Sequence, residues 1–549
     1  MDITIDENMT AADTSKSVTE QLLISSERKN KASWTVWLLV TVIILTGLVF
    51  RFMLLNAFLL DFDESMHFQV AREASLYDAW NASRIHTHPP LAFLFYHYWI
   101  ALGDSELMLR MPSLLFSIPA LIFSFLWFRE ILGERPALIG LVFLTFSMPM
   151  IHLGALMRGY MLLLTFIYAA LYLQERFYKT RSLWALAGNC SCLILAMLTH
   201  YSTAWLILAL GLLGLLRVVS GTFSKRMIVG WVISQFVLLG VCLAFYFGHV
   251  HAFLKSTARK DLWEFWLTDS AYDPNTTHPV YLAMMRVMEF IQYLSGPLRI
   301  FIIGLLIMGI YMLFKKGVQE NRSKWVAFER GMLVLIPFMV AMLLFHLRIY
   351  PVGHTRHSMW LVPFAGLAVA AGSWPLLKRP GLIKNGIAVV LILLWIDSFA
   401  YPNVWKLKTT QTPQMARQVV AVIEKTIPAG ATILTDDSTR NVLEYYLVGR
   451  TVLHGKPLGN GYTEYEMDGY RVVTIPKFHF YLYNIETDWE SFTEVFGPDS
   501  TEPLWLVYLG LETSDAQTSN VFKRFPPGKI IKRASFLDNQ ILQVQFQTP

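Results

Sequence analysis

Three carboxylates lie within four residues, at Asp61, Asp63 and Glu64, directly after the first long apolar run of the chain. That run is long enough to cross a bilayer, so the carboxylates stand where a membrane helix must leave the lipid. Charged side chains at that depth cost free energy, so their presence suggests that they serve chemistry at the water boundary. Carboxylates would supply acid–base chemistry there. The alternative is an ordinary acidic flank, and the four residues alone favour that flank.

Histidines, tyrosines and arginines recur at the ends of other apolar runs. The histidine and tyrosine candidates are His86, His88, His200 and Tyr201. The arginine candidates are Arg110, Arg158, Arg348 and Arg356. A guanidinium suits a phosphodiester, because it can donate two parallel hydrogen bonds to it. The alternative is an arginine that extends to the lipid headgroups and anchors its helix.

Neither a metal site nor a disulfide framework is expected. His86 and His88 are two residues apart, which suits a pair of metal ligands, but no fixed metal-binding spacing accompanies them. Cys190, Cys192 and Cys242 lie in apolar runs without a CxxC motif, so they are interpreted as packed thiols. We therefore predict that no cofactor is required, with a divalent cation as the alternative.

Composition indicates a polytopic helical membrane protein. The 549 residues are 54% hydrophobic and only 16% charged, and their mean hydropathy is positive. The net charge of +6 calls for no nucleic-acid partner, because the basic residues concentrate between apolar segments. Residues 1–33 are polar and lack an apolar core, which predicts a flexible cytoplasmic tail rather than a cleavable signal.

Eleven apolar segments are long enough to span a bilayer. They cover residues 34–55, 111–128, 136–152, 158–174, 183–199, 203–219, 227–248, 293–314, 329–347, 357–376 and 384–400. Residues 89–102 are short and carry His97, so an interfacial helix is predicted there instead of a span. With eleven spans, every short basic loop falls on the cytoplasmic side, as the positive-inside rule requires. The loop 56–110, the other candidate residues and the carboxyl end then face outward.

Residues 401–549 have the composition of a soluble domain, which predicts an α/β domain outside the membrane. Thr412-Pro413 is a typical helix start and opens an amphipathic segment. Strand-like runs follow at 431–434, 471–475, 478–483 and 504–509, and Asp538-Asn539 predicts the turn of a final hairpin. No phosphate-binding loop or nucleophile elbow is present in this domain, so no chemistry is assigned to it.

The polar motifs of residues 34–400 have an order that resembles a known family. In sequence they are Asp63-Glu64, His86-Thr87-His88-Pro89-Pro90, Arg110-Met111-Pro112, Arg158-Gly159-Tyr160, Thr199-His200-Tyr201, and Arg356 with Pro363. This set resembles polyprenyl-phosphate-sugar-dependent glycosyltransferases of the GT-C class. It is similar to protein O-mannosyltransferases and to lipid A aminoarabinose transferases. The signal lies in the ordered set rather than in any single motif.

The resemblance implies that an acceptor hydroxyl or amine displaces a sugar from a lipid phosphate with inversion. Asp63 matches an acidic position of the family, and it would be the general base. Glu64 is the alternative base, or it orients the acceptor, holds a cation or simply begins a helix. Asp61 is interpreted as a flank.

The resemblance also implies a set of substrate-binding residues. His88, Arg158 and Arg356 would contact the donor phosphate. Weaker support assigns substrate contacts to His86, Arg110, Tyr160, His200 and Tyr201. The chain departs from many relatives at Leu156, where they carry an acidic residue two positions before the arginine. The carboxylates of the first loop are therefore the main acid–base groups.

Three functions follow from these observations. The first is a glycosyltransferase in the plasma or inner membrane, with an undecaprenyl- or dolichyl-type phosphate sugar as donor. Its acceptor would be a protein, lipid or glycan of the cell envelope, on the periplasmic or outer side. The second is a GT-C oligosaccharide ligase or polymerase with a diphosphate-linked donor. The third is a transporter or flippase, which the lack of an internal repeat and of midplane charges disfavours.

Overall fold

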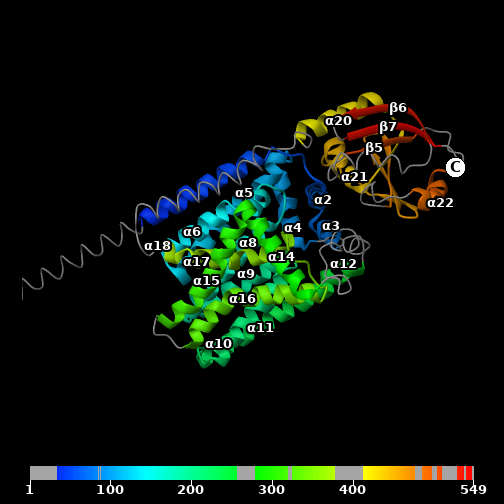
Figure 1. The fold of residues 1–549 in the computed structure, drawn as a ribbon. Helices are drawn as coiled ribbons and strands as arrows, with labels where there is room; N and C mark the ends of the chain where they lie inside the picture. The colour runs from blue at the N-terminus through cyan, green and yellow to red at the C-terminus, as the bar shows by residue number, and fades with distance from the viewer. Residues whose placement is uncertain are drawn as a thin grey trace, which may run out of the picture.

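The computed structural model describes residues 34–84, 86, 88–255, 278–319, 324–377, 412–476, 485–497, 504–509, 528–536 and 539–546. In these residues a large bundle of helices is followed by a smaller C-terminal unit of helices and strands (Figure 1). The predicted tail 1–33, the span 384–400, the strand 478–483 and Asp538 of the predicted turn lie outside the described residues.

The helical part begins with the helix Trp34–Leu54. Three helices and a short 3₁₀ turn follow in the first loop: α2 (Phe62–Ala71), α3 (Leu76–Ser83), α4 (Pro90–Trp99) and η1 (Ile100–Leu102). The next helices are α5 (Glu106–Leu132), α6 (Glu134–Thr145), α7 (Met148–Leu153), α8 (Tyr160–Thr180), α9 (Leu183–Met197), α10 (Thr203–Val219) and α11 (Lys225–Phe245). After η2 (Tyr246–Val250) come α12 (His251–Lys255), α14 (Pro279–Ser295), η5 (Gly296–Leu298), α15 (Arg299–Gln319), α16 (Lys324–His346), η6 (Arg356–Leu361), α17 (Val362–Gly372) and α18 (Trp374–Leu377).

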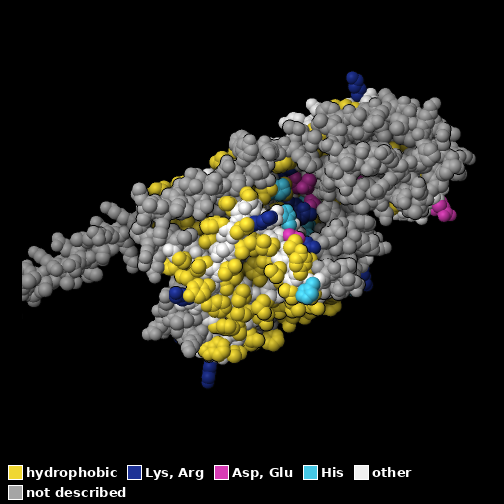
Figure 2. Space-filling model, viewed as in Figure 1, with side chains coloured by type: hydrophobic (Ala, Val, Ile, Leu, Met, Phe, Trp, Pro, Cys, Tyr) yellow, Lys and Arg dark blue, Asp and Glu magenta, His cyan; other side chains and the backbone are white. Residues whose placement is uncertain are grey.

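Five helices among the described residues are long and apolar enough to cross a membrane. Together with the composition, they identify the chain as a helical membrane protein. On the face shown in Figure 2, hydrophobic side chains cover most of the helical part, as expected for a surface in contact with lipid. Charged and histidine side chains gather at the end of this surface that lies toward the C-terminal unit. The count of eleven spans stays a prediction.

The predicted span 136–152 is interrupted in the structure. Helix α6 ends at Thr145, and α7 begins at Met148 after a break at Phe146 and Ser147. Pro149 lies in the first turn of α7, where its missing N–H costs nothing. In a continuous helix the same proline would remove a hydrogen bond and its ring would clash with the preceding turn. Hydropathy alone does not detect this break, because both halves are apolar.

Residues 89–102 form the short helix α4 followed by η1. Phe93 and Tyr96 of α4 are buried, and His97 Nδ1 lies 2.9 Å from the carbonyl oxygen of Ala71 at the end of α2. Helix α4 therefore packs against α2 within the first loop and supports it. Its position at a membrane surface stays a prediction.

The C-terminal unit contains a seven-stranded sheet in the order β2-β3-β4-β1-β5-β7-β6. Its strands are β1 (Thr432–Thr435), β2 (Lys456–Gly459), β3 (Tyr462–Met467), β4 (Tyr470–Thr474), β5 (Leu504–Tyr508), β6 (Gly528–Phe536) and β7 (Asn539–Phe546). Its helices are α20 (Pro413–Thr426), α21 (Asp437–Leu443), η8 (Glu444–Val448, a π-helical turn) and α22 (Ile485–Phe496).

Strand β1 lies at the centre of this sheet and pairs in parallel with β4 and β5, whereas the other pairs are antiparallel. Thr412 caps α20 as predicted, since its side chain accepts a hydrogen bond from the N–H of Met415. The hairpin β2–β3 was not predicted, although Gly459-Asn460-Gly461 is a recognisable turn signal, and all three residues have positive φ. Its strands are short and largely polar, so the alternation that marks a strand is weak.

Two cysteine substitutions test the predicted orientation. We expect His454→Cys to react with an impermeant maleimide added outside the cell and Gln319→Cys not to react, because the positive-inside rule places the loop after α15 in the cytoplasm. The background is a variant in which Cys190, Cys192 and Cys242 are replaced by serine or alanine, since each could react. The opposite labelling pattern would contradict the eleven-span orientation.

Candidate functional site

Asp61 is the N-cap of α2. Its Oδ1 accepts a hydrogen bond of 2.7 Å from the N–H of Glu64, and the N–H of Asp61 donates back to Glu64 Oε2 at 3.3 Å. This reciprocal arrangement is a capping box, which fixes the first turn of the helix. Burial and then the charges of Glu64 and Asp63 raise the pKa of Asp61 to about 7. Asp61 thus has a structural role as the cap that sets the direction in which α2 starts, and its interpretation as a flank without a chemical role stays a prediction.

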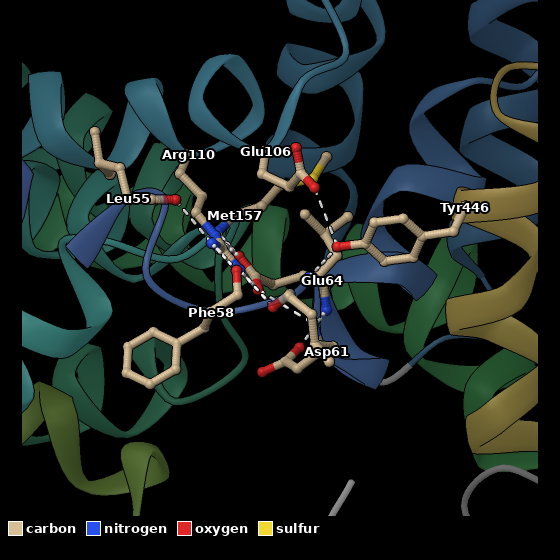
Figure 3. Close-up of polar contacts among 10 residues, drawn as sticks. Leu55, Phe58, Asp61, Glu64, Glu106, Arg110, Met157 and Tyr446 are labelled. Atoms are coloured by element: carbon tan, nitrogen blue, oxygen red, sulfur yellow. Dashed lines mark hydrogen bonds and ion pairs between the residues drawn. The ribbon is translucent and has the colours of Figure 1, made fainter. Parts of the chain in front are cut away.

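Glu64 forms a buried ion pair with Arg110 at the start of α5 (Figure 3). Arg110 Nε donates to Glu64 Oε1 at 2.8 Å and Nη2 donates to Oε2 at 2.5 Å. The other Arg110 hydrogens reach the carbonyl oxygens of Leu55 and Phe58 from Nη1 and of Leu59 from Nη2, at 2.7 to 2.8 Å. All five donors of this guanidinium are thus used.

The ion pair with Arg110 leaves the Glu64 carboxylate little capacity to accept further hydrogen bonds. Its Oε1 also accepts a 2.6 Å hydrogen bond from the N–H of Met157, and neither Glu64 nor Arg110 is exposed to solvent. A fully bonded carboxylate paired with a fully bonded guanidinium holds the first loop to α5. This geometry does not support Glu64 as the alternative base or Arg110 as a phosphate ligand, since neither has a free atom to offer.

Asp63, one residue earlier, faces a different environment. Its Oδ1 lies 3.2 Å from Arg158 Nη1, and its Oδ2 pairs with Arg356 Nη2. The Asp63 side chain is 15% exposed, Arg158 is 1% exposed and Arg356 is 31% exposed. Burial opposes ionisation of Asp63, but attraction to Arg158 and Arg356 outweighs it and holds the pKa of this carboxyl well below its usual range. Asp63 therefore joins a buried cation and a partly exposed cation in one accessible cluster.

Histidines surround the Arg158 side of this cluster. Arg158 Nη2 donates to His88 Nε2 at 3.0 Å, so His88 must be neutral to accept. The His88 ring lies 5.2 Å from that of His67 and 5.6 Å from that of His200. Burial first, and Arg158 second, lowers the pKa of both His88 and His67 well below the usual value. These neutral imidazoles lie around the guanidinium of Arg158 and the carboxylate of Asp63.

Two of the histidines in this cluster were not predicted as site residues. His67 donates from Nδ1 to the carbonyl oxygen of Asp63 at 2.8 Å, one helical turn along α2. His357 follows Arg356, and its ring lies 6.1 Å from that of His200. Their spacing from predicted residues, four positions in one case and one in the other, is the signal that could have found them.

Of the remaining candidates, Tyr160 lies in the cluster and Tyr201 does not. Tyr160 belongs to the cluster: the Arg158 guanidinium lies 5.8 Å from the centre of its ring, and its buried hydroxyl has no hydrogen-bond partner among the described residues. Tyr201 points elsewhere, since its hydroxyl lies 3.1 Å from His249 Nδ1 in η2. Burial, opposed by the charge of Asp437 in the C-terminal unit, lowers the pKa of His86 to about 4. Arg348 follows α16 in a left-handed conformation.

The chain is similar to known membrane glycosyltransferases in part of its sequence. Residues 87–246 match the sequence model of a family described as dolichyl-phosphate-mannose-protein mannosyltransferase. This segment includes His88, Arg158 and His200 but not Asp63 or Arg356. No curated protein sequence is significantly similar to the chain.

Solved structures extend the likeness to most of the chain. ArnT from Cupriavidus metallidurans in the apo state matches with a TM-score of 0.52 and 14% identity over 93% of this chain and 98% of that one. The same protein bound to undecaprenyl phosphate has a TM-score of 0.51 and 13% identity, covering 92% and 97%. The apo oligosaccharyltransferase of Archaeoglobus fulgidus has a TM-score of 0.51 and 10% identity, covering 89% and 73%. Identities this low show a shared fold, and together with the family match they confirm the predicted resemblance: the chain is similar to GT-C glycosyltransferases of the protein mannosyltransferase and ArnT type.

Proposed function

We propose that this protein transfers a sugar from a polyprenyl-phosphate donor to an acceptor hydroxyl or amine, with inversion at the anomeric carbon. The observation that carries the proposal is the Asp63 carboxylate held between Arg158 and Arg356. Such a site places a proton acceptor beside two cations, which is what displacement of a phosphate leaving group requires. The ArnT structure with bound undecaprenyl phosphate supports a lipid-phosphate donor by likeness of fold.

The proposed reaction moves one proton and exchanges one bond. Asp63 accepts the proton of the acceptor hydroxyl or amine as the acceptor atom bonds to the anomeric carbon. The bond from that carbon to the phosphate oxygen breaks, and the polyprenyl phosphate leaves with the electron pair. Arg356 and Arg158 stabilise the charge that develops on the departing phosphate. The site contains one acceptor of protons and two stabilising cations, so each step has a named residue.

Arg356 couples the binding of the donor to the basicity of Asp63. Without donor, Arg356 pairs with Asp63 and helps to lower its pKa, which makes the carboxylate a weak base. A bound phosphodiester competes for Arg356, the more exposed of the two cations. Once this contact is shared or lost, the pKa of Asp63 rises and the carboxylate accepts a proton more readily. We propose that donor binding activates the base in this way.

The second candidate is a GT-C ligase or polymerase that uses a diphosphate-linked donor. The shared fold with the Archaeoglobus oligosaccharyltransferase supports keeping it. A diphosphate carries more negative charge than a phosphodiester, so it would need cations beyond Arg158 and Arg356 or a bound metal ion. The two-arginine cluster fits the monophosphate donor better.

Mass spectrometry of lipid extracts and envelope glycans, with and without the protein, tests the proposal. We expect cells lacking the protein to accumulate a polyprenyl-phosphate sugar and to lose that sugar from an envelope acceptor. Purified protein should then transfer the sugar from the isolated lipid to the acceptor. Accumulation of a diphosphate-linked oligosaccharide instead would favour the ligase. Unchanged lipids and glycans would overturn both candidates.

The dependence of transfer on pH follows from the position of Asp63. The base must be ionised, and its pKa in the free protein lies well below the usual 3.8. We therefore expect kcat/KM to show no acid limb from Asp63 between about pH 5 and pH 7. We expect Asp61, with a pKa of about 7, to add only a weak dependence in that range. Asp61→Asn should remove such a limb, and a limb that persists in this variant would contradict the assignment.

Removal of divalent cations should leave the activity unchanged. The proposed chemistry uses arginines where a metal would otherwise neutralise the leaving phosphate, so no metal is required. We expect the rate of transfer after treatment with EDTA and exchange into metal-free buffer to equal that of untreated protein. A loss that is restored by adding back Mg²⁺, Mn²⁺ or Zn²⁺ would contradict this proposal and favour the divalent-cation alternative.

A further inference from the structure

Residues 440–450 of the C-terminal unit, here called the contact segment, reach the far end of α2. Gln69 Nε2 donates to Glu444 Oε2 at 2.9 Å, and Arg440 Nη1 donates to Gln69 Oε1 at 3.3 Å. Arg72, which caps the C-terminal end of α2, forms an ion pair with Glu444 Oε1, and both side chains are 2% exposed. Arg440 also donates to Glu444 at 2.5 Å. A buried carboxylate of one unit is thus bonded to three groups, one of them on α2 and one at its C-cap.

The same segment reaches the other end of α2. The Tyr446 hydroxyl accepts a hydrogen bond of 3.3 Å from the N–H of Leu60, the residue before the N-cap Asp61. It donates at 3.1 Å to Glu106, the first residue of α5 (Figure 3). Glu106 and Arg110 belong to the same helix, so this contact joins the buried ion pair of Arg110 to the C-terminal unit. Both ends of α2 therefore contact one short segment.

The local conformation of the contact segment explains how its side chains contact both ends of α2. Residues Glu444–Val448 form a π-helical turn, a wide turn that is uncommon and is often found at functional sites. Gly449 ends the turn with φ of 64°, and its carbonyl oxygen accepts a hydrogen bond of 2.5 Å from Arg72 Nη1. Tyr445, between the two key residues, packs its ring on Phe68 of α2 at 5.1 Å. Three successive side chains, Glu444 to Tyr446, thus face the first loop.

We infer that the contact segment positions Asp63 by holding α2 at both ends, with Glu444 and Tyr446 as positioning residues. Helix α2 is ten residues long, which corresponds to about 15 Å, so loss of the contacts at its ends would loosen the helix and displace Asp63. Arg158 and Arg356 lie on other elements, before α8 and at the start of η6. Loosening α2 would therefore move the base away from the cations without moving the cations. The inference rests on the proposed function, in which Asp63 is the base.

Two conservative variants and one control test this inference. Tyr446→Phe removes only the hydroxyl, and Glu444→Gln keeps the shape of the side chain but removes its charge. Arg450→Ala is the matched control, because Arg450 lies in the same segment but its ion pair with Asp104 is about half exposed on both sides. Each protein is compared with the unaltered chain in steady-state transfer and in hydrogen–deuterium exchange of the α2 and α8 amides.

We expect kcat to fall about 10- to 100-fold in the Tyr446 and Glu444 variants, as a displaced catalytic group requires. The KM for the donor should not rise, because the proposed phosphate ligands stay in place and a displaced Asp63 competes less for Arg356. Amides of α2 should exchange faster in both variants, with α8 unchanged and Arg450→Ala equal to the unaltered chain. If Glu444 and Tyr446 only stabilised the fold, their substitution would instead raise hydrogen–deuterium exchange in both α2 and α8.

Several outcomes would overturn the inference. These are an unchanged α2 exchange in both variants, a general rise that includes α8, or an equal effect of Arg450→Ala. A raised donor KM with unchanged kcat would also overturn it, because the segment would then act on binding. If the unaltered protein transfers no sugar from any lipid phosphate, the proposed function fails by itself. The exchange measurement then still decides whether the segment holds α2, because it needs no substrate.

Discussion

Asp63→Asn is expected to abolish sugar transfer while the protein still folds and inserts into the membrane. An amide of the same shape cannot accept the acceptor's proton, and loss of a general base lowers rates by about 10²- to 10⁴-fold. The amide also fails to balance Arg158 and Arg356, with which the carboxylate pairs. The measurement is the rate of transfer from a polyprenyl-phosphate sugar by purified protein. Size-exclusion profile and thermal stability report on folding.

Asp61→Asn is the matched control for this variant. Both substitutions replace a first-loop aspartate by asparagine, but Asp61 acts as a helix cap, a role that asparagine fills equally well. We expect the Asp61 variant to keep most of its activity. Full transfer activity in Asp63→Asn would remove Asp63 from the mechanism. Equal losses in both variants would show that the first turn of α2, rather than one carboxylate, is what the reaction needs.

The order of polar motifs was enough to predict the centre of the cluster. Asp63, His88, Arg158 and Arg356 come from four separate segments, yet the structure brings them into contact. Their positions at the ends of apolar runs, on one predicted side of the membrane, predict a common site. The assignment of chemical roles within that site stays a proposal.

Contacts between distant side chains were not predictable in the same way. Glu64 and Asp63 are adjacent in sequence, but successive residues of a helix point about 100° apart, and only the fold decides which of them meets which arginine. Arg110 meets Glu64 46 residues away, and Glu444 meets Arg72 across more than 370 residues. No local pattern encodes such pairs. They depend on how α2, α5 and the C-terminal unit pack together.

The break between α6 and α7 and the hairpin β2–β3 were missed for local reasons instead. Both are marked by residues with special backbone preferences, Pro149 in the first case and the Gly459 to Gly461 turn in the second. Hydropathy and alternation, the patterns used for the prediction, are insensitive to such residues. Attention to proline and glycine would have corrected both elements.

Arg110→Ala is expected to destabilise the protein strongly rather than to weaken donor binding. The substitution leaves the Glu64 carboxylate buried without its partner and exposes three carbonyl oxygens to a cavity. Breaking a buried ion pair from one side costs about 3–5 kcal/mol. We expect a large fall in thermal stability and in the yield of folded protein, measured in detergent by the midpoint of thermal unfolding.

Arg471→Ala is the control for that variant, because Arg471 forms an exposed ion pair with Glu464 that should contribute only about 0–1 kcal/mol. If Arg110 were instead a donor ligand, Arg110→Ala would fold normally and show a raised donor KM with little change in stability. That result would restore the role predicted for Arg110 from its place among the ordered motifs. It would also mean that donor binding draws Arg110 away from Glu64. The stability measurement therefore separates an arginine that holds the first loop to α5 from one that binds the lipid phosphate.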